Sequence, residues 1–140
     1  GQVHGLIESY LPPKIEKGWI EDYEEALLVG AENSKPIFLD FTGYTCTNCR
    51  WMEKNIFTQH EIEKLFEDFI LVRLYTDGGE NARKYQQMEI DRYGTAALPF
   101  YVVMDQNENT INTFHGMDPN VNKFINFLEE SLNQFNKGIQ

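Results

Sequence analysis

The two cysteines of the chain, Cys46 and Cys49, are separated by two residues and stand where a predicted strand gives way to a predicted helix. The strand is the apolar run 35–41, the segment 42–44 has the composition of a turn, and the pattern is helical over 47–57. Cys46 is therefore expected at the helix N-terminus, where unpaired backbone N–H groups and the helix dipole favour a thiolate. Cys49 follows one turn later on the same face, so the two thiols can exchange one disulfide with a partner.

Two other uses of this cysteine pair are less well supported. A structural disulfide stabilises a protein according to the size of the loop that it closes, and this loop is very small. A zinc site needs four ligands, and the remaining candidates, His4, His60 and His115, do not have the spacing of a metal site. We therefore expect a redox-active pair with no bound metal.

The composition limits the class of protein and its partners. With 140 residues, 41% of them hydrophobic, the chain has the size of one domain with its own core, and we expect a monomer that folds alone. Its net charge of −10 argues against nucleic acid or an anionic membrane surface as a partner. No apolar stretch approaches the roughly 20 residues that cross a bilayer, so we expect no membrane insertion by this chain. The N-terminus lacks a signal-peptide pattern and begins at Gly1 rather than Met, which is typical of a processed protein or a piece of a longer one.

Residues 1–18 have little periodicity and are expected to be an irregular lead-in or the end of a linker, followed by one domain over 19–140. The domain should hold an α/β fold with a central mixed sheet, helices on both faces and an antiparallel C-terminal hairpin, which is the thioredoxin architecture. The patterns predict strands at 36–41, 69–75, 100–104 and 110–114 and, between the first three, helices at 47–57 and 80–93 and a helix that opens with a capping box from Thr58 to Glu61. A first helix, capped by Asp22, precedes them, and a last helix follows them with Asp118 as its cap and Pro119 in its first position. The inward-facing residues are expected to be Ala26, Leu27 and Ala31 on the first helix and Ala82, Tyr85, Ile90 and Tyr93 on helix 80–93.

These residues resemble a known family. From about Trp19 to Phe135 the chain is similar to the thioredoxin superfamily, and more narrowly to the C-terminal periplasmic thioredoxin-like domain of the DsbD family of thiol:disulfide interchange proteins. The narrower likeness is carried by four stretches: 35–41, 46–53, Leu98-Pro99-Phe100 and Gly116-Met117-Asp118. In that family the domain receives electrons from a membrane-embedded domain and passes them to a second periplasmic domain.

The resemblance implies a protein-disulfide reductase that relays electrons by dithiol–disulfide exchange, with the Cys46–Cys49 disulfide as its redox centre and no cofactor. It also implies a periplasmic location, as the soluble domain of a membrane protein, and partners that are protein thiols and disulfides. Two alternatives stay open at this point. One is a free-standing thioredoxin-like reductase, for example in cytochrome c maturation, and the other is a redox-inactive or metal-dependent binding module.

Four residues carry the expected chemistry. Cys46, at the helix start, should attack, and Cys49 should resolve the mixed disulfide. Asp40 matches the buried acid of thioredoxins, which is assigned a role in proton transfer, unless it points to solvent from an edge strand. Glu53 lies four residues beyond Cys49 on the same helical face, where its charge would oppose thiolate formation, unless it only pairs with Arg50 or Lys54.

Five residues are expected to dock the partner. Tyr44 and Thr45 precede Cys46, and Thr45 stands where thioredoxins commonly carry an aromatic residue. Pro99 matches the cis-proline that faces the cysteines in thioredoxins, and Leu98 can offer its backbone to an extended partner segment. Met117 borders the same surface or makes an ordinary apolar contact in a loop.

Overall fold

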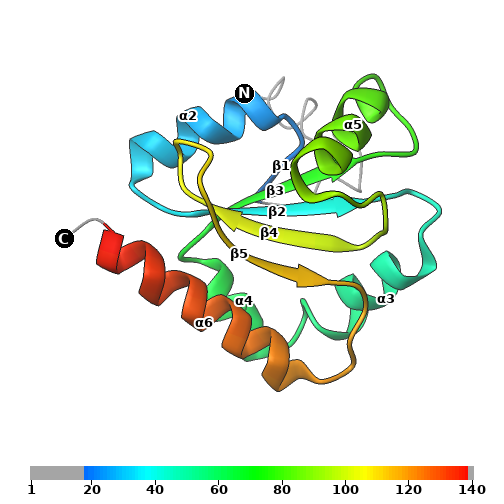
Figure 1. The fold of residues 1–140 in the computed structure, drawn as a ribbon. Helices are drawn as coiled ribbons and strands as arrows, with labels where there is room; N and C mark the ends of the chain where they lie inside the picture. Colours follow the sequence, from blue (N-terminus) through cyan, green and yellow to red (C-terminus); the bar gives the residue numbers. More distant parts are fainter. Residues whose placement is uncertain (1–17, 139–140) are drawn as a thin grey trace, which may run out of the picture.

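The computed structural model describes residues 18–138, which form a mixed sheet in the strand order β1-β3-β2-β4-β5 (Figure 1). β1, β3 and β2 run parallel, whereas β4 is antiparallel to β2 and β5 is antiparallel to β4. The strands are β1 (Trp19–Ile20), β2 (Ile37–Thr42), β3 (Ile70–Tyr75), β4 (Phe100–Met104) and β5 (Thr110–His115). This arrangement confirms the predicted fold class. The predicted lead-in falls almost entirely on residues 1–17, which lie outside the described residues, as does His4.

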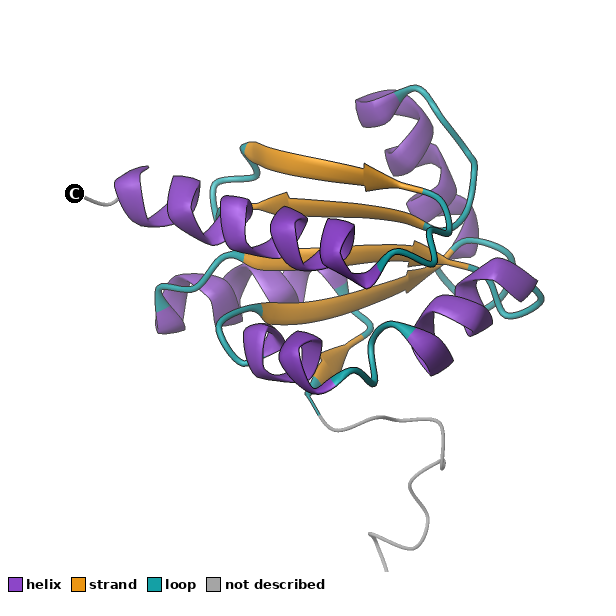
Figure 2. Ribbon diagram, turned by 90° about the horizontal axis from the view of Figure 1, so that it is seen from below, coloured by secondary structure: helices purple, strands orange, loops and turns teal. Residues whose placement is uncertain are grey.

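Helices cover both faces of the sheet, with α2 and α5 on one face and α3, α4 and α6 on the other (Figures 1 and 2). Their bounds are α2 (Tyr23–Asn33), α3 (Thr47–Asn55), α4 (His60–Phe66), α5 (Ala82–Tyr93) and α6 (Val121–Gly138). Within residues 18–138, none of these helices combines the length and the apolar character that crossing a bilayer requires.

Alternation along β2 produces two separate cores, because successive side chains of a strand point to opposite faces. Ile37, Leu39 and Phe41 pack under α2 and α5. Phe38 points to the other face, where it contacts an aromatic cluster under α4 and α6. The rings around Phe38 are those of Trp19, Phe57, Phe66, Phe69, Tyr101, Phe124 and Phe127.

The sequence misplaced the starts of α4 and α6 and missed β1, each for a local reason. Thr58 is no cap, because its hydroxyl donates to the Lys54 carbonyl at the end of α3, and α4 begins at His60. The last helix begins at Val121 rather than Pro119, because the Asp118 carboxylate accepts the N–H of Asn120 in a turn before the helix. The two-residue strand β1 was missed, since so short a segment has no periodicity.

Two predicted helix faces also need correction. Asp22 caps α2 as expected, accepting the Glu25 N–H at 2.8 Å, but Ala31 is exposed, because Gly30 packs against the sheet in its place. On α5, Ile90 is exposed and Glu89 is buried. Glu89 lies one turn beyond Tyr85 on the buried face of α5, whereas Ile90 is about 100° away around the helix and falls outside that face.

The topology brings several loops to one edge of the sheet. β2, β3 and β5 end at this edge and β4 begins there, so the segments that follow Thr42, Tyr75 and His115 lie near the one that precedes Phe100 (Figure 1). Cys46, the Leu98-Pro99 segment and Met117 belong to these loops, and Cys49 lies in the first turn of α3, which follows the loop after β2.

Candidate redox site

Cys46 and Cys49 form a disulfide at the start of α3. Cys46 is the N-cap residue of that helix, and its sulfur accepts the Cys49 N–H at 3.1 Å. Cys46 is partly exposed, whereas Cys49 is buried with 1% of its surface accessible. This difference in exposure agrees with an attacking Cys46 and a resolving Cys49, and the roles themselves stay predictions.

Asp40 is buried in the central strand β2 and is 1% exposed, so the alternative of a solvent-facing carboxylate on an edge strand is wrong. It follows Phe38 by two residues and therefore points to the face that α3 covers. The Arg73 Nε lies 3.4 Å from its Oδ2, across the register of β2 and β3. The pKa of Asp40 is raised to about 7, because desolvation by burial and the nearby Glu53 charge together raise it by more than the Arg73 guanidinium lowers it.

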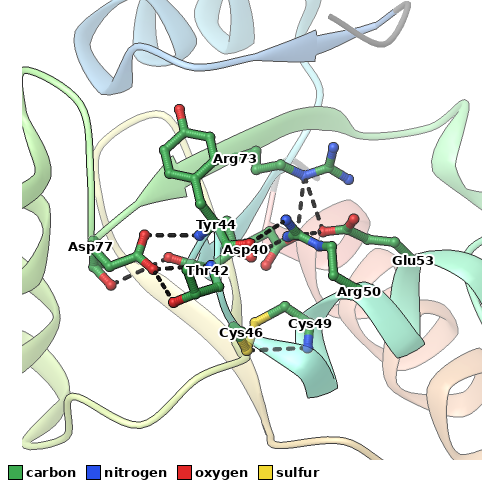
Figure 3. Close-up of polar contacts among 11 residues, drawn as sticks. Asp40, Thr42, Tyr44, Cys46, Cys49, Arg50, Glu53, Arg73 and Asp77 are labelled. Atoms are coloured by element: carbon green, nitrogen blue, oxygen red, sulfur yellow. Dashed lines mark hydrogen bonds and ion pairs between the residues drawn. A yellow bond between two sulfur atoms is a disulfide. The ribbon is translucent and has the colours of Figure 1, made fainter. Parts of the chain in front are cut away.

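Glu53 connects this buried pair to the surface. Its carboxylate lies 2.7 Å from the Arg50 guanidinium and 3.8 Å from that of Arg73, and its side chain is 19% exposed. Glu53 thus pairs with Arg50, as one alternative held, and it also lies near Arg73, whereas its effect on the thiols stays a prediction. A chain of alternating charge thus runs from the sheet to α3, through Asp40 on β2, Arg73 on β3, and Glu53 and Arg50 on α3 (Figure 3).

Sequence reasoning missed Arg73, and for Arg50 it considered only a pair with Glu53 and not a place in the site. Arg73 is the single charge in the apolar run 69–75, and that was the available signal for a buried partner of Asp40. Its guanidinium also lies 4.0 Å from the centre of the Trp19 ring, as a cation–π contact. Arg50 directly follows Cys49, and nothing in the sequence distinguished it from an exposed helical arginine.

Tyr44 and Thr45 form the turn that leads into Cys46, and a third missed residue holds them. The Asp77 carboxylate, from the loop after β3, accepts hydrogen bonds from both residues (Figure 3). The Tyr44 ring stacks on Tyr75 with its centre 3.8 Å away and remains 41% exposed. In the sequence, Asp77 shows only as the first residue of the turn pattern Asp77-Gly78-Gly79 that follows the strand 69–75.

The remaining predicted docking residues lie at the same edge of the sheet. The Leu98–Pro99 peptide bond is cis, as the resemblance implied, and the Pro99 carbonyl accepts the Gly116 N–H at 2.9 Å. Leu98 lies beside residues 43–46, the turn that leads into Cys46 and is called the cysteine turn below, since a Cβ added to Gly43 would be 3.1 Å from Leu98 Cδ1. Met117 is exposed after β5, and its part in docking stays a prediction.

No group of three or more His, Cys, Asp or Glu side chains in residues 18–138 is arranged to hold a metal ion. The polar groups around the cysteines instead form ion pairs and hydrogen bonds with one another. What this arrangement can do chemically is to exchange two electrons through the sulfurs.

Fold and site together define a class of protein, a thioredoxin-like oxidoreductase with a CxxC disulfide. The family model described as Thioredoxin-like matches residues 18–106, more than half of the chain, and the chain therefore belongs to that family. Among curated proteins, the thiol:disulfide interchange protein DsbD of Campylobacter jejuni is 25% identical over 83 residues, in strain RM1221 and in serotype O:2 alike. The match covers 59% of this chain and only 15% of that protein.

Solved structures share the fold. A thioredoxin from Thermus thermophilus superposes with a TM-score of 0.69 at 16% identity, over 87% of this chain and 92% of that one. The reduced C-terminal domain of DsbD from Neisseria meningitidis gives 0.64 at 20% identity, over 77% and 92%. A DsbH oxidoreductase gives 0.57 at 25% identity, over 84% and 90%. Together with the family model and the DsbD relative, the shared fold bears out the resemblance to a DsbD-like thioredoxin domain.

Proposed function

We propose that this chain is a protein-disulfide reductase domain that relays electrons from a membrane-embedded donor domain to protein disulfides in the periplasm. The observation that carries the proposal is the Cys46–Cys49 disulfide, with Cys46 partly exposed at a helix start and Cys49 buried. A disulfide that serves only stability needs no exposed sulfur, whereas exchange needs one that a partner can reach.

The reductive half-cycle follows from this geometry. The Cys46 thiolate attacks one sulfur of the partner disulfide, a new S–S bond forms, and the partner's second sulfur leaves as a thiolate that takes up a proton. The Cys49 thiolate then attacks the Cys46 sulfur and releases the partner's first thiolate, which is also protonated. Two electrons have passed to the partner, and Cys46 and Cys49 are joined again.

Asp40 is the candidate proton carrier for the Cys49 step. Cys49 and Glu53 are four residues apart and share one face of α3, and Glu53 lies beside the Asp40–Arg73 pair. With a pKa raised to about 7 by burial, Asp40 is poised to take the Cys49 proton and return it near neutral pH. This role is a proposal that the kinetics of Asp40→Asn would test.

The relay role rests on the likeness to DsbD, a thiol:disulfide interchange protein by name. Because the chain spans about a seventh of the length of that relative, the donor, the acceptor and the periplasmic setting are all part of the proposal. A free-standing reductase would use the same chemistry at Cys46 and Cys49, so only the partners distinguish the two.

The reaction is tested first with the isolated chain. Equilibration in glutathione buffers of known potential should give a reversible two-electron transition, and the reduced protein should reduce the disulfides of insulin. Cys46→Ser should abolish both. Absence of a transition, or stoichiometric zinc on the reduced protein, would support a binding module in place of an oxidoreductase.

The relay is tested by trapping. Cys49→Ser in the full-length protein should accumulate a mixed disulfide through Cys46 with the acceptor in vivo, and Cys46→Ser is the matched control. Recovery of a periplasmic domain of the same protein supports the relay, whereas recovery of separate cytoplasmic thiol proteins alone would contradict it.

A further inference from the structure

Asp77 lies on an exposed loop, yet both oxygens of its carboxylate accept hydrogen bonds from the cysteine turn. Its Oδ1 accepts the Tyr44 N–H at 2.8 Å, and its Oδ2 accepts the Thr45 N–H at 3.2 Å and the Thr45 hydroxyl at 3.0 Å (Figure 3). A carboxylate has two acceptor oxygens, and here both are directed at the two residues before Cys46. Asp77 and Tyr44 are 33 residues apart in sequence.

Two glycines allow the cysteine turn and the loop after β3 to approach each other closely. A Cβ added to Gly43 would stand 2.8 Å from Asp77 Oδ2, so any side chain at that position would displace the Asp77 carboxylate from its present place. A Cβ added to Gly78 would lie 3.0 Å from the Tyr44 ring. The turn and the loop after β3 therefore approach closely because both lack side chains at the point of contact.

The turn is held from its other side as well. The Cys46 N–H donates to the Gly43 carbonyl at 3.2 Å, and the Arg50 guanidinium lies 3.5 Å from the Tyr44 carbonyl. With its N–H groups bound by Asp77, the turn has little freedom, and the Tyr44 ring lies flat on Tyr75, with an interplanar angle of 6°. An exposed aromatic ring fixed in this way loses little entropy when a partner packs on it.

Asp77 is suited to remain a charged acceptor at neutral pH. Partial desolvation raises the pKa of Asp77, but the N–H groups of Tyr44 and Thr45 and the Thr45 hydroxyl lower it by more, so the pKa lies below its ordinary value. An asparagine at this position would replace one of the two acceptor oxygens by an NH2 group, which donates, so at least one of the hydrogen bonds from Tyr44 and Thr45 would be lost.

We propose that Asp77 is a specificity-determining positioning residue, which holds Tyr44 on Tyr75 as a rigid aromatic platform against which an apolar or aromatic side chain of a disulfide-bearing partner polypeptide packs. The platform stands two residues before Cys46, within reach of the chain on either side of a disulfide that Cys46 attacks. The inference rests on the proposed exchange reaction and names the chemistry of the partner segment that this site prefers.

The test compares two disulfides in single-turnover reactions of the reduced protein. Insulin presents a polypeptide around its disulfides, whereas hydroxyethyl disulfide is small and aliphatic and offers nothing to pack on Tyr44. Asp77→Asn should slow insulin reduction about tenfold, the effect of losing roughly one aromatic contact, and leave the rate with hydroxyethyl disulfide within about twofold. Asp91→Asn, on an exposed carboxylate that bonds only to Gln87 among the described contacts, is the matched control and should change neither rate.

A double-mutant cycle identifies the platform as the cause. Tyr44→Ala should slow insulin reduction as much as Asp77→Asn, and the double variant should be no slower than either, because both changes remove the same contact. Amide hydrogen exchange at Tyr44 and Thr45 should accelerate in Asp77→Asn while the thermal midpoint changes little.

The outcomes that overturn the inference differ from those that overturn the proposed function. Equal losses with both disulfides, additive effects of the two substitutions, or an unchanged insulin rate would each contradict the platform. If the wild-type protein reduces neither disulfide, the proposed function fails, and the amide exchange measurement still decides whether Asp77 holds the turn.

Discussion

At the scale of single residues, Cys46 and Cys49 differ in exposure, and this predicts which of them reacts first. Limited alkylation of the reduced protein should label Cys46 well before Cys49, because Cys49 is 1% exposed. Peptide mass mapping after short reaction times measures the ratio. Preferential labelling of Cys49 would reverse the assigned roles.

Asp40 and Glu53 should oppose thiolate formation at Cys46. We expect its pKa at or above the free-thiol value of about 8.5, since two carboxylates near the pair offset the helix N-terminus, which alone would lower it. Asp40→Asn combined with Glu53→Gln should move the pH dependence of Cys46 alkylation to lower pH. Arg73 is shared by both carboxylates, whereas Arg50 pairs with Glu53 at 2.7 Å, so Asp40→Asn alone should account for most of the shift.

The matched control is Glu61→Gln, on an exposed carboxylate of α4, which should leave the titration unchanged. A wild-type pKa well below 7, or one that the double substitution does not move, would leave the helix N-terminus as the controlling influence.

At the scale of elements, α5 carries an unusual residue on its packed face. Glu89 is fully buried, and neither of its carboxylate oxygens has a hydrogen-bond partner within residues 18–138. Desolvation raises the pKa of Glu89 to about 8 from its ordinary value of 4.5. The side chain is therefore protonated in the folded protein at neutral pH.

This burial predicts a loss of stability as the pH rises. In the unfolded chain Glu89 releases its proton near pH 4.5, whereas in the folded protein it keeps the proton until about pH 8. The free energy of unfolding should therefore fall between these two pH values and level off above them. Glu89→Gln should flatten the fall, and Glu89→Leu should raise the free energy of unfolding at pH 8 by roughly 1–3 kcal/mol.

Urea unfolding of the oxidised protein at several pH values measures both effects, and Glu129→Gln, on an exposed position of α6, is the control. Asp40 contributes in the same direction between 3.8 and about 7, so some fall remains in the Glu89 variants. A wild-type profile that rises from pH 5 to pH 8 would contradict the burial of an uncharged Glu89.

At the scale of the whole molecule, the aromatic cluster under α4 and α6 holds β2, β4 and the helices of that face together through Phe38. Phe38→Ala should lower the free energy of unfolding by about 3–5 kcal/mol, because the ring is fully buried among large neighbours that cannot close the cavity. Leu28→Ala, on the most exposed large apolar side chain of the described residues, should change it by less than about 0.5 kcal/mol. Chemical denaturation of the oxidised forms compares the two, and similar losses would mean that the core is not centred on Phe38.

The sequence by itself determined the features that depend on only a few neighbouring residues. The apolar run before Cys46, the helical pattern after it and the spacing of the pair place the disulfide at a helix start, and Asp22 was correctly expected to cap α2. Alternation and turn residues were enough for the antiparallel pairing of β4 and β5. These features depend on backbone geometry over one or two turns, which local composition controls.

Only the tertiary structure decided which distant groups meet at the site. Arg73 lies beside Asp40, and Asp77 lies beside Tyr44, in each case across 33 residues of sequence. These contacts depend on the register of β3 against β2, which neither strand encodes alone. The burial of Glu89 in place of Ile90 likewise follows from the way α5 packs on the sheet, which buries the face that carries Tyr85 and Glu89 and leaves Ile90, about 100° away around the helix, exposed.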